Sequence, residues 1–110
     1  MDVKGRVIYL AGPMTGKPHL NRAVFAEATG VLREMGAVVY NPAGTLMSEL
    51  VEKGHKEASA AWRENVRFMA NHCDAMVMLP GWEDSPGAAL ENELARTMGL
   101  TVMEYSEVGE

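Results

Sequence analysis

A short apolar run, a turn and the start of a helix follow one another in one stretch of this chain. It reads Ala75-Met76-Val77-Met78-Leu79-Pro80-Gly81-Trp82-Glu83-Asp84-Ser85-Pro86-Gly87-Ala88-Ala89-Leu90-Glu91. The continuous apolar part predicts a strand that is buried on both faces. Ser85 is a favourable N-cap and Pro86 suits the first helical position, so a helix is expected to begin there. A buried strand that leads through a loop into a helix is typical of a parallel sheet.

The same alternation of apolar runs and helical patterns continues along the chain. We expect buried strands at residues 7–11, 37–40, 75–79 and 100–103. We expect helices at about residues 20–35, 58–72 and 86–98, and a short one within 43–57. In the last long helix, the spacing predicts that Leu90, Leu94 and Met98 face inward. The pattern therefore favours one α/β domain over residues 1–110, with its core at about 6–103 and a parallel sheet of four or five strands.

Composition and charge limit the classes of partner. The formal net charge of −5 argues against binding to a nucleic-acid polymer, which usually requires a basic face. No apolar run approaches the roughly 20 residues needed to span a bilayer, so no membrane partner is expected. The first residues lack the apolar segment of a signal peptide, and the single cysteine, Cys73, fits a reducing cytoplasm. The three histidines show no metal-ligand spacing, and we expect neither a metal nor an organic cofactor.

Three loops that follow expected strands form the candidate ligand-binding region. Parallel strands bring their carboxyl ends to one edge of the sheet, where ligands of such folds bind. The first loop is able to wrap a small ligand through Gly12, Met14, Thr15 and Gly16. The second begins at Asn41, which either forms only a turn with the following proline or contacts the ligand. The third loop comprises residues 80–85.

The third loop leads to the candidate catalytic residue, Glu91. Backbone N–H groups at a helix start have no partner in the helix and attract anions. Glu91 lies six residues after Ser85, about one and a half turns into the helix. We expect the helix dipole to keep this carboxylate ionised at neutral pH. An ionised carboxylate beside an anion-binding helix start can hold a nucleotide and attack the anomeric carbon of its sugar.

Five other residues of this region each allow two interpretations. Ser85 and Gly87 are either a cap and a small helical residue or ligand contacts. Asp84 is either a turn residue or a partner of the ribose or base. Tyr9 is either core or a hydroxyl that reaches the cleft, and Trp82 either stacks on a base or packs at a subunit interface.

Several blocks of this sequence together resemble a known superfamily. They are Ile8-Tyr9-Leu10-Ala11-Gly12-Pro13-Met14-Thr15-Gly16, Asn41-Pro42-Ala43, Cys73-Asp74-Ala75, and Leu79-Pro80-Gly81-Trp82-Glu83 followed by Ser85, Gly87, Ala88 and Glu91. In these blocks the chain resembles the small phage and bacterial branch of the nucleoside 2-deoxyribosyltransferase-like superfamily. The resemblance covers roughly residues 6–103. It implies a flavodoxin-like three-layer sandwich.

The resemblance also implies a reaction. Its better-understood members are the nucleoside 2-deoxyribosyltransferases, the deoxynucleoside 5′-monophosphate N-glycosidases and the hydroxymethyl-CMP hydrolases. They cleave the bond between base and sugar with a glutamate nucleophile, and Ser85, Gly87 and Glu91 reproduce the spacing of the monophosphate-hydrolysing branch. By resemblance, Ser85 and Gly87 would contact the 5′-phosphate and Tyr9 would position the reacting groups. Relatives complete their sites across a subunit boundary, so a homodimer or larger homo-oligomer is expected.

The chain departs from those enzymes at two places. Pro13 and Thr15 stand where the monophosphate-binding loop has a serine and an arginine, and Asn65 lies near the position of an aspartate proton donor. The leading hypothesis is an N-glycosidase or deoxyribosyltransferase that acts on a nucleoside or nucleoside 5′-monophosphate. The alternative is a non-catalytic protein that senses or sequesters a nucleotide-derived ligand. A third hypothesis is an assembly module whose Trp82 loop is an interface.

Overall fold

The computed structural model describes residues 2–109, and within them strands and helices alternate as expected. The strands are β1 Val7–Ala11, β2 Val38–Tyr40, β3 Ala75–Met78 and β4 Thr101–Glu104. The α-helices are α1 Arg22–Glu34, α2 Leu46–Glu52, α3 Ala58–His72 and α4 Pro86–Thr97. Short 3₁₀ turns occur at Pro18–Asn21, Pro42–Gly44, Trp82–Asp84 and Tyr105–Glu107.

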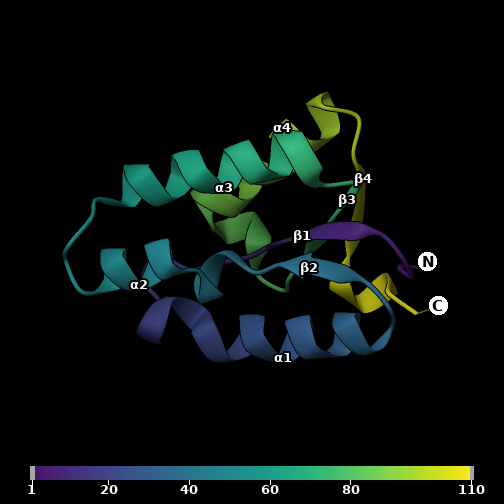
Figure 1. Cartoon of the computed structure of the whole chain (residues 1–110), viewed down its shortest axis with the longest axis horizontal. Coiled ribbons are helices and arrows are strands. Elements are labelled where there is room, and N and C mark those ends of the chain that lie inside the picture. Colours follow the sequence, from purple (N-terminus) through teal and green to yellow (C-terminus); the bar gives the residue numbers. More distant parts are fainter. Residues whose placement is uncertain (1, 110) are drawn as a thin grey trace.

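The sheet confirms the expected fold class. Its strands are all parallel in the order β2-β1-β3-β4, so β1 and β3 are central. Figure 1 shows α1 on one side of the sheet and α3 with α4 on the other, which is a flavodoxin-like three-layer arrangement. Of the two strand counts that the sequence left open, residues 2–109 form the four-stranded one.

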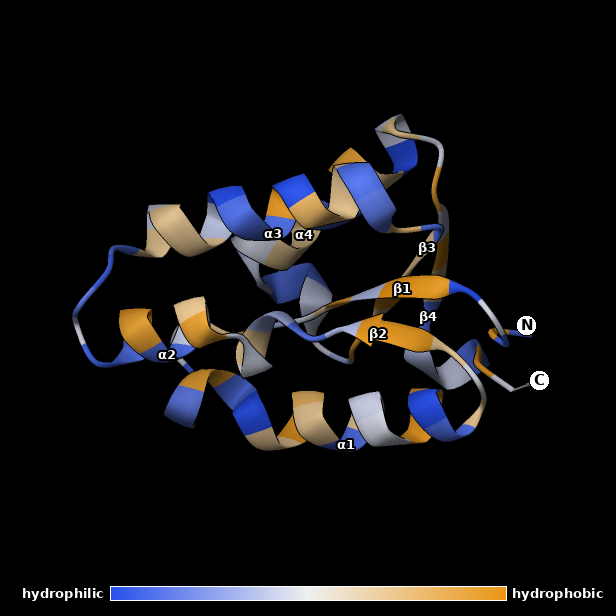
Figure 2. Ribbon diagram, viewed as in Figure 1, coloured by the Kyte–Doolittle hydropathy of each residue, from blue (hydrophilic) through white to orange (hydrophobic). Residues whose placement is uncertain are grey.

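The two faces of the sheet use alternate residues of each strand. In β1, Ile8 and Leu10 belong to the core beneath α1, whereas Tyr9 and Ala11 belong to the core beneath α3 and α4. Figure 2 shows the resulting apolar strands between helices that are polar on their outer sides. Because both faces are covered, the strands are continuous apolar runs, as the sequence predicted.

Side chains cap two of the helices at the edge of the sheet where the loops gather. The Ser85 Oγ accepts a hydrogen bond from the Ala88 N–H at 3.3 Å, which confirms Ser85 as the N-cap of α4. The Thr45 Oγ1 likewise accepts from the Ser48 N–H at 3.0 Å and fixes the start of α2. Both caps therefore fix the position of a helix start at this edge.

The predicted orientation of α4 is confirmed for Leu94, which is partly buried and packs against the core beneath α3 and α4, and is wrong for Leu90 and Met98. Leu90 is 46% exposed and Met98 is 39% exposed, so these side chains do not face the core. The buried residues of α4 are Ala88, Glu91, Asn92 and Ala95. The small Ala88 and Ala95 let the helix lie close to the sheet, and Leu94 is the large apolar residue among the three that packs against this core.

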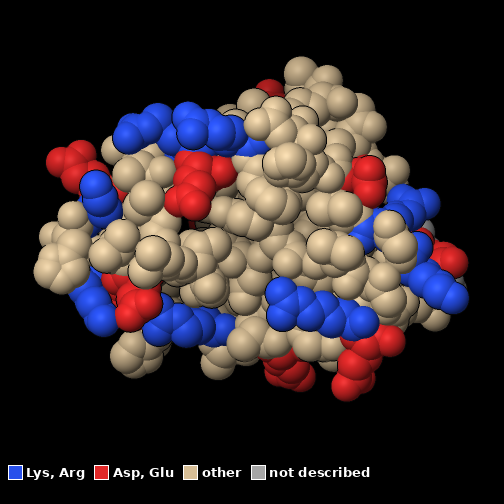
Figure 3. All heavy atoms as spheres, in the orientation of Figure 1, with Lys and Arg blue, Asp and Glu red and all other residues tan. Residues whose placement is uncertain are grey.

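The surface carries charges of both signs. On the face shown in Figure 3, basic and acidic side chains alternate around an uncharged middle. Across residues 2–109, each helix is too short or too polar to cross a membrane.

Gly12, directly after β1, is expected to be intolerant of a side chain. A Cβ at this position would lie 2.8 Å from the Leu79 Cβ, so one of the two segments would have to move. We expect Gly12→Ala to lower the free energy of unfolding by about 1–3 kcal/mol, as overpacking does. The matched control is Gly30→Ala in α1, where a Cβ meets nothing within 4 Å and a gain of about 0.5–1 kcal/mol is expected. Urea unfolding measures the free energy of unfolding of both variants. Equal values for Gly12→Ala and Gly30→Ala would contradict the prediction.

Candidate active site at the carboxyl edge of the sheet

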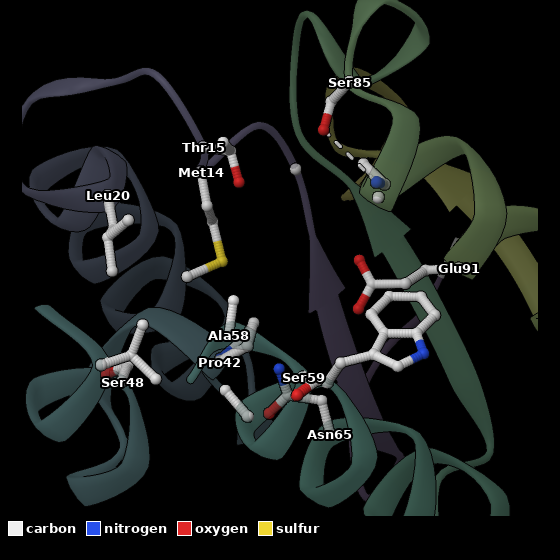
Figure 4. Close-up of a pocket in the computed structure, with 16 residues that line it drawn as sticks. Met14, Thr15, Leu20, Pro42, Ser48, Ala58, Ser59, Asn65, Ser85 and Glu91 are labelled. Atoms are coloured by element: carbon white, nitrogen blue, oxygen red, sulfur yellow. Dashed lines mark hydrogen bonds between the residues drawn. The ribbon is translucent and has the colours of Figure 1, made fainter. Parts of the chain in front are cut away.

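A cavity of about 390 Å³ lies where the loops after β1 and β2 meet the starts of α3 and α4. Its wall consists of Gly12, Met14, Thr15, Leu20, Pro42, Ser48, Val51, Ala58, Ser59, Ala61, Trp62, Asn65, Ser85, Gly87, Ala88 and Glu91. Figure 4 shows Met14 and Thr15 on one side, Ser85 and Glu91 on the other, and Asn65 below them. The cavity therefore lies at the edge where parallel sheets bind ligands.

Glu91 projects from α4 into this cavity. Its side chain is buried, with 7% of the residue exposed, and its carboxylate points toward the cavity centre in Figure 4. The Tyr9 hydroxyl donates a hydrogen bond to the Glu91 Oε2. Gly87 lies four residues earlier, on the same side of the helix, and also lines the cavity. The carboxylate and the start of α4 thus share one cavity, as the sequence spacing required.

The ionisation of Glu91 differs from the expectation. Burial raises the pKa of this carboxyl from 4.5 to about 7, while the hydrogen bond from Tyr9 acts in the lowering direction. At neutral pH the protonated and ionised forms are therefore present in similar amounts. The expectation of full ionisation considered the helix dipole and omitted the loss of hydration, which has the larger effect here.

Tyr9 joins the core to the cavity, so the two interpretations of this residue are compatible. Its ring is fully buried in the core beneath α3 and α4, and its hydroxyl reaches Glu91. Burial, and next the charge of Glu91, raise the pKa of Tyr9 well above 10.0. The hydroxyl therefore stays protonated and serves as a hydrogen-bond donor.

The start of α4 leaves room for a ligand. Ser85 uses its Oγ to cap the Ala88 N–H, and Pro86 has no N–H. A Cβ at Gly87 would meet nothing within 4 Å, so packing does not require glycine here. The absence of a side chain at Gly87 instead keeps the backbone open toward the cavity.

The structure brings some predicted ligand contacts to the cavity and places others elsewhere. Gly12, Met14, Thr15, Ser85 and Gly87 line it together with Glu91. Gly16, Asn41, Asp84 and Trp82 lie outside its wall, and ligand contact by these four residues stays a prediction.

Two of these outlying side chains have structural partners. The Asn41 Oδ1 accepts a hydrogen bond from the Ala43 N–H at 2.9 Å and caps the short turn after β2. The Trp82 Nε1 donates to the Glu104 carboxylate at 2.9 and 3.1 Å, and its ring packs against the core beneath α3 and α4. These contacts account for both residues without a ligand.

Sequence reasoning missed the wall that α2 and α3 contribute. It includes Ser48 and Val51 from α2 and Ala58, Ser59, Ala61 and Trp62 from α3. Residues 43–57 carry no clear periodicity, and only the three-dimensional arrangement shows that α2 closes this side. The polarity of Ser59 and the aromatic ring of Trp62 near the start of a helix were the available signals.

The fold and cavity define an α/β protein of flavodoxin-like architecture with a buried carboxylate at the carboxyl edge of its sheet. Residues 6–104 match the family described as "Domain of unknown function (DUF4406)". The chain therefore belongs to the DUF4406 family. No curated protein matches it.

The raised pKa of Glu91 predicts a pH-dependent stability. Between pH 4.5 and about 7 the folded state retains a proton that the unfolded state loses, so stability falls as pH rises through this window. Each pKa unit corresponds to about 1.4 kcal/mol, which makes the loss about 3 kcal/mol. Glu91→Gln stays uncharged at every pH. We therefore expect its free energy of unfolding, relative to that of the wild type, to be about 3 kcal/mol higher at pH 8 than at pH 4.

Urea unfolding at both pH values measures this difference. The matched control is Glu93→Gln, because Glu93 is exposed on the same helix. It should follow the wild type at each pH. Parallel pH profiles for the wild type and Glu91→Gln would contradict the prediction.

Proposed function

We propose that this protein is an N-glycosidase or deoxyribosyltransferase that cleaves the bond between base and sugar of a nucleoside or nucleotide. The observation that carries the proposal is the buried Glu91 carboxylate, which faces a cavity of ligand size and is held by Tyr9. Cavities of roughly 300–1,000 Å³ are typical of small-molecule sites. The resemblance to the nucleoside 2-deoxyribosyltransferase-like superfamily supports the same residue as nucleophile.

The reaction needs one carboxylate and one positioning hydroxyl. The ionised Glu91 attacks C1′ of the sugar, the C1′–N bond breaks, and the base leaves with the bonding electron pair and takes a proton from water. Water then attacks C1′, the bond between C1′ and the Glu91 oxygen breaks, and the proton released by this water neutralises the hydroxide left by the first step. Attack of a second base on C1′ gives transfer instead. Tyr9 fixes the orientation of Glu91 through its hydrogen bond and remains protonated throughout.

The cavity wall favours an uncharged ligand. Among the described residues that line it, Glu91 is the one with an ionisable acid or base in its side chain, and the others are apolar or neutral. Ser85, Ala88 and Ala89 already donate their backbone N–H groups within the protein, and Pro86 has none. A 5′-phosphate would therefore depend on the Gly87 N–H at the start of α4, without the charge-assisted partner that an arginine supplies. A nucleoside therefore fits this wall better than a nucleoside 5′-monophosphate.

A binding protein without turnover is the second candidate. Asn65 supports it, because an amide on the cavity wall cannot deliver a proton to a departing base. Such a protein would bind nucleosides or nucleotides and release no base from any of them. The same experiment separates the two candidates.

The test is incubation with a panel of nucleosides and nucleoside 5′-monophosphates, with free base followed by chromatography. We expect base release by the wild type and a loss of at least roughly a thousandfold in kcat with Glu91→Gln, because the nucleophile is gone. Glu93→Gln is the matched control and should keep its activity. Binding without base release by the wild type would establish the second candidate instead.

The pH dependence tests the role of Tyr9. Since the ionised form of Glu91 is the nucleophile, kcat/KM should rise with pH, with a midpoint near 7. Removing the hydrogen bond that lowers the Glu91 pKa should move this midpoint upward in Tyr9→Phe. A midpoint that is unchanged in Tyr9→Phe would show that Tyr9 does not tune the carboxyl group.

A further inference from the structure

Two tyrosines on neighbouring strands hold two different groups of the cavity wall. Tyr9 and Tyr40 are register partners in β1 and β2, and their rings stack at a centroid distance of 5.4 Å. The Tyr9 hydroxyl donates to Glu91, and the Tyr40 hydroxyl donates to the Asn65 Oδ1 at 2.8 Å. The stacked pair therefore holds Asn65 of α3 and Glu91 of α4 on the wall of one cavity.

The hydrogen bond from Tyr40 determines which end of the Asn65 amide is free. Burial, and next the charge of Glu64, raise the pKa of Tyr40 to about 12, so its hydroxyl remains a donor. A donor at Oδ1 leaves the Nδ2 group, with its two N–H bonds, as the end available to the cavity. Asn65 is buried, with 8% exposed, so this amide is nearly fixed in place.

We propose that the Asn65 Nδ2 donates a hydrogen bond to the base acceptor adjacent to the glycosidic nitrogen, which is N3 of a purine or O2 of a pyrimidine. The inference rests on the proposed function, because Glu91 must lie at C1′ for an amide on the same cavity wall to face the base. When the C1′–N bond breaks, the electron pair moves into the base, and this acceptor gains negative charge. The amide stabilises that charge and transfers no proton, which the base takes from water.

This role differs from recognition of one particular base. Purines and pyrimidines both carry an acceptor next to the glycosidic nitrogen, so the donor accepts both classes. Tyr40 acts as a positioning residue, since its effect on the base passes through the orientation of Asn65. Phe68 stacks on Tyr40 at 4.3 Å and supports that orientation from the outer side.

The experiment compares a purine nucleoside with its 3-deaza analogue, which lacks the acceptor. The readout is kcat/KM for the purine nucleoside divided by kcat/KM for the 3-deaza analogue. This ratio is measured in the wild type, in Asn65→Leu and in Tyr40→Phe. Taking the ratio within each variant removes the intrinsic difference between the two leaving groups. We expect Asn65→Leu to reduce the ratio by about ten- to a hundredfold, as for a lost hydrogen bond to a charged acceptor, and Tyr40→Phe to reduce it less.

Matched controls remove the same groups elsewhere. Asn71→Leu changes an exposed asparagine of α3, and Tyr105→Phe removes a hydroxyl on the opposite face of the sheet. Both should keep the wild-type ratio. Tyr40→Phe retains the stacked ring, so it tests the orientation of the amide even if Asn65→Leu fails to fold.

Each outcome decides the inference separately from the proposed function. Base release by the wild type with an unchanged ratio in Asn65→Leu and Tyr40→Phe overturns the role of Asn65 and leaves the glycosidase intact. If the wild type binds nucleosides without releasing base, the ratio of association constants, purine over 3-deaza analogue, is taken from calorimetry instead. A smaller ratio in both variants then supports the contact while the reaction fails. Absence of both release and binding overturns both proposals.

Discussion

The hydrogen bond from Tyr9 to Glu91 is the interaction on which the rest of this site depends. It joins the central strand β1 to the first turns of α4, inside a region from which water is largely removed. A carboxyl group placed there loses most of its hydration, and one phenolic donor replaces a small part of it. The result is a group with a pKa near 7 that is held in one orientation by a residue of the sheet.

The geometry of α4 follows from the need to bring that carboxyl group close to the sheet. Ala88 and Ala95 occupy its inward face, and Leu90 and Met98 are left exposed. Large side chains on the inward face would push the helix outward and separate Glu91 from Tyr9. Helix α4 therefore buries less apolar surface than its sequence would allow, and the close approach of Glu91 to the sheet takes precedence. Such a compromise between stability and function is common.

Most of the fold and a part of the site could be predicted from the sequence. Continuous apolar runs identified a parallel sheet, and Ser85 with Pro86 located the start of α4, because these signals are local. The orientation of Leu90 and the pKa of Glu91 could not be predicted, because both depend on how closely α4 packs on the sheet. The bond between Tyr40 and Asn65 joins residues 25 positions apart, and no local pattern indicates it.

The raised pKa of Glu91 has a consequence for the proposed reaction as well as for stability. The surroundings of the ionised carboxylate stabilise it poorly, because they offer few charges or donors. In the proposed reaction, the sugar that loses its base develops positive charge at C1′, where Glu91 would attack. That charge interacts most strongly with an anion that water does not screen. The burial that destabilises the ionised carboxylate before the reaction therefore stabilises the transition state of the proposed reaction. A fully hydrated glutamate at this position would lack that difference.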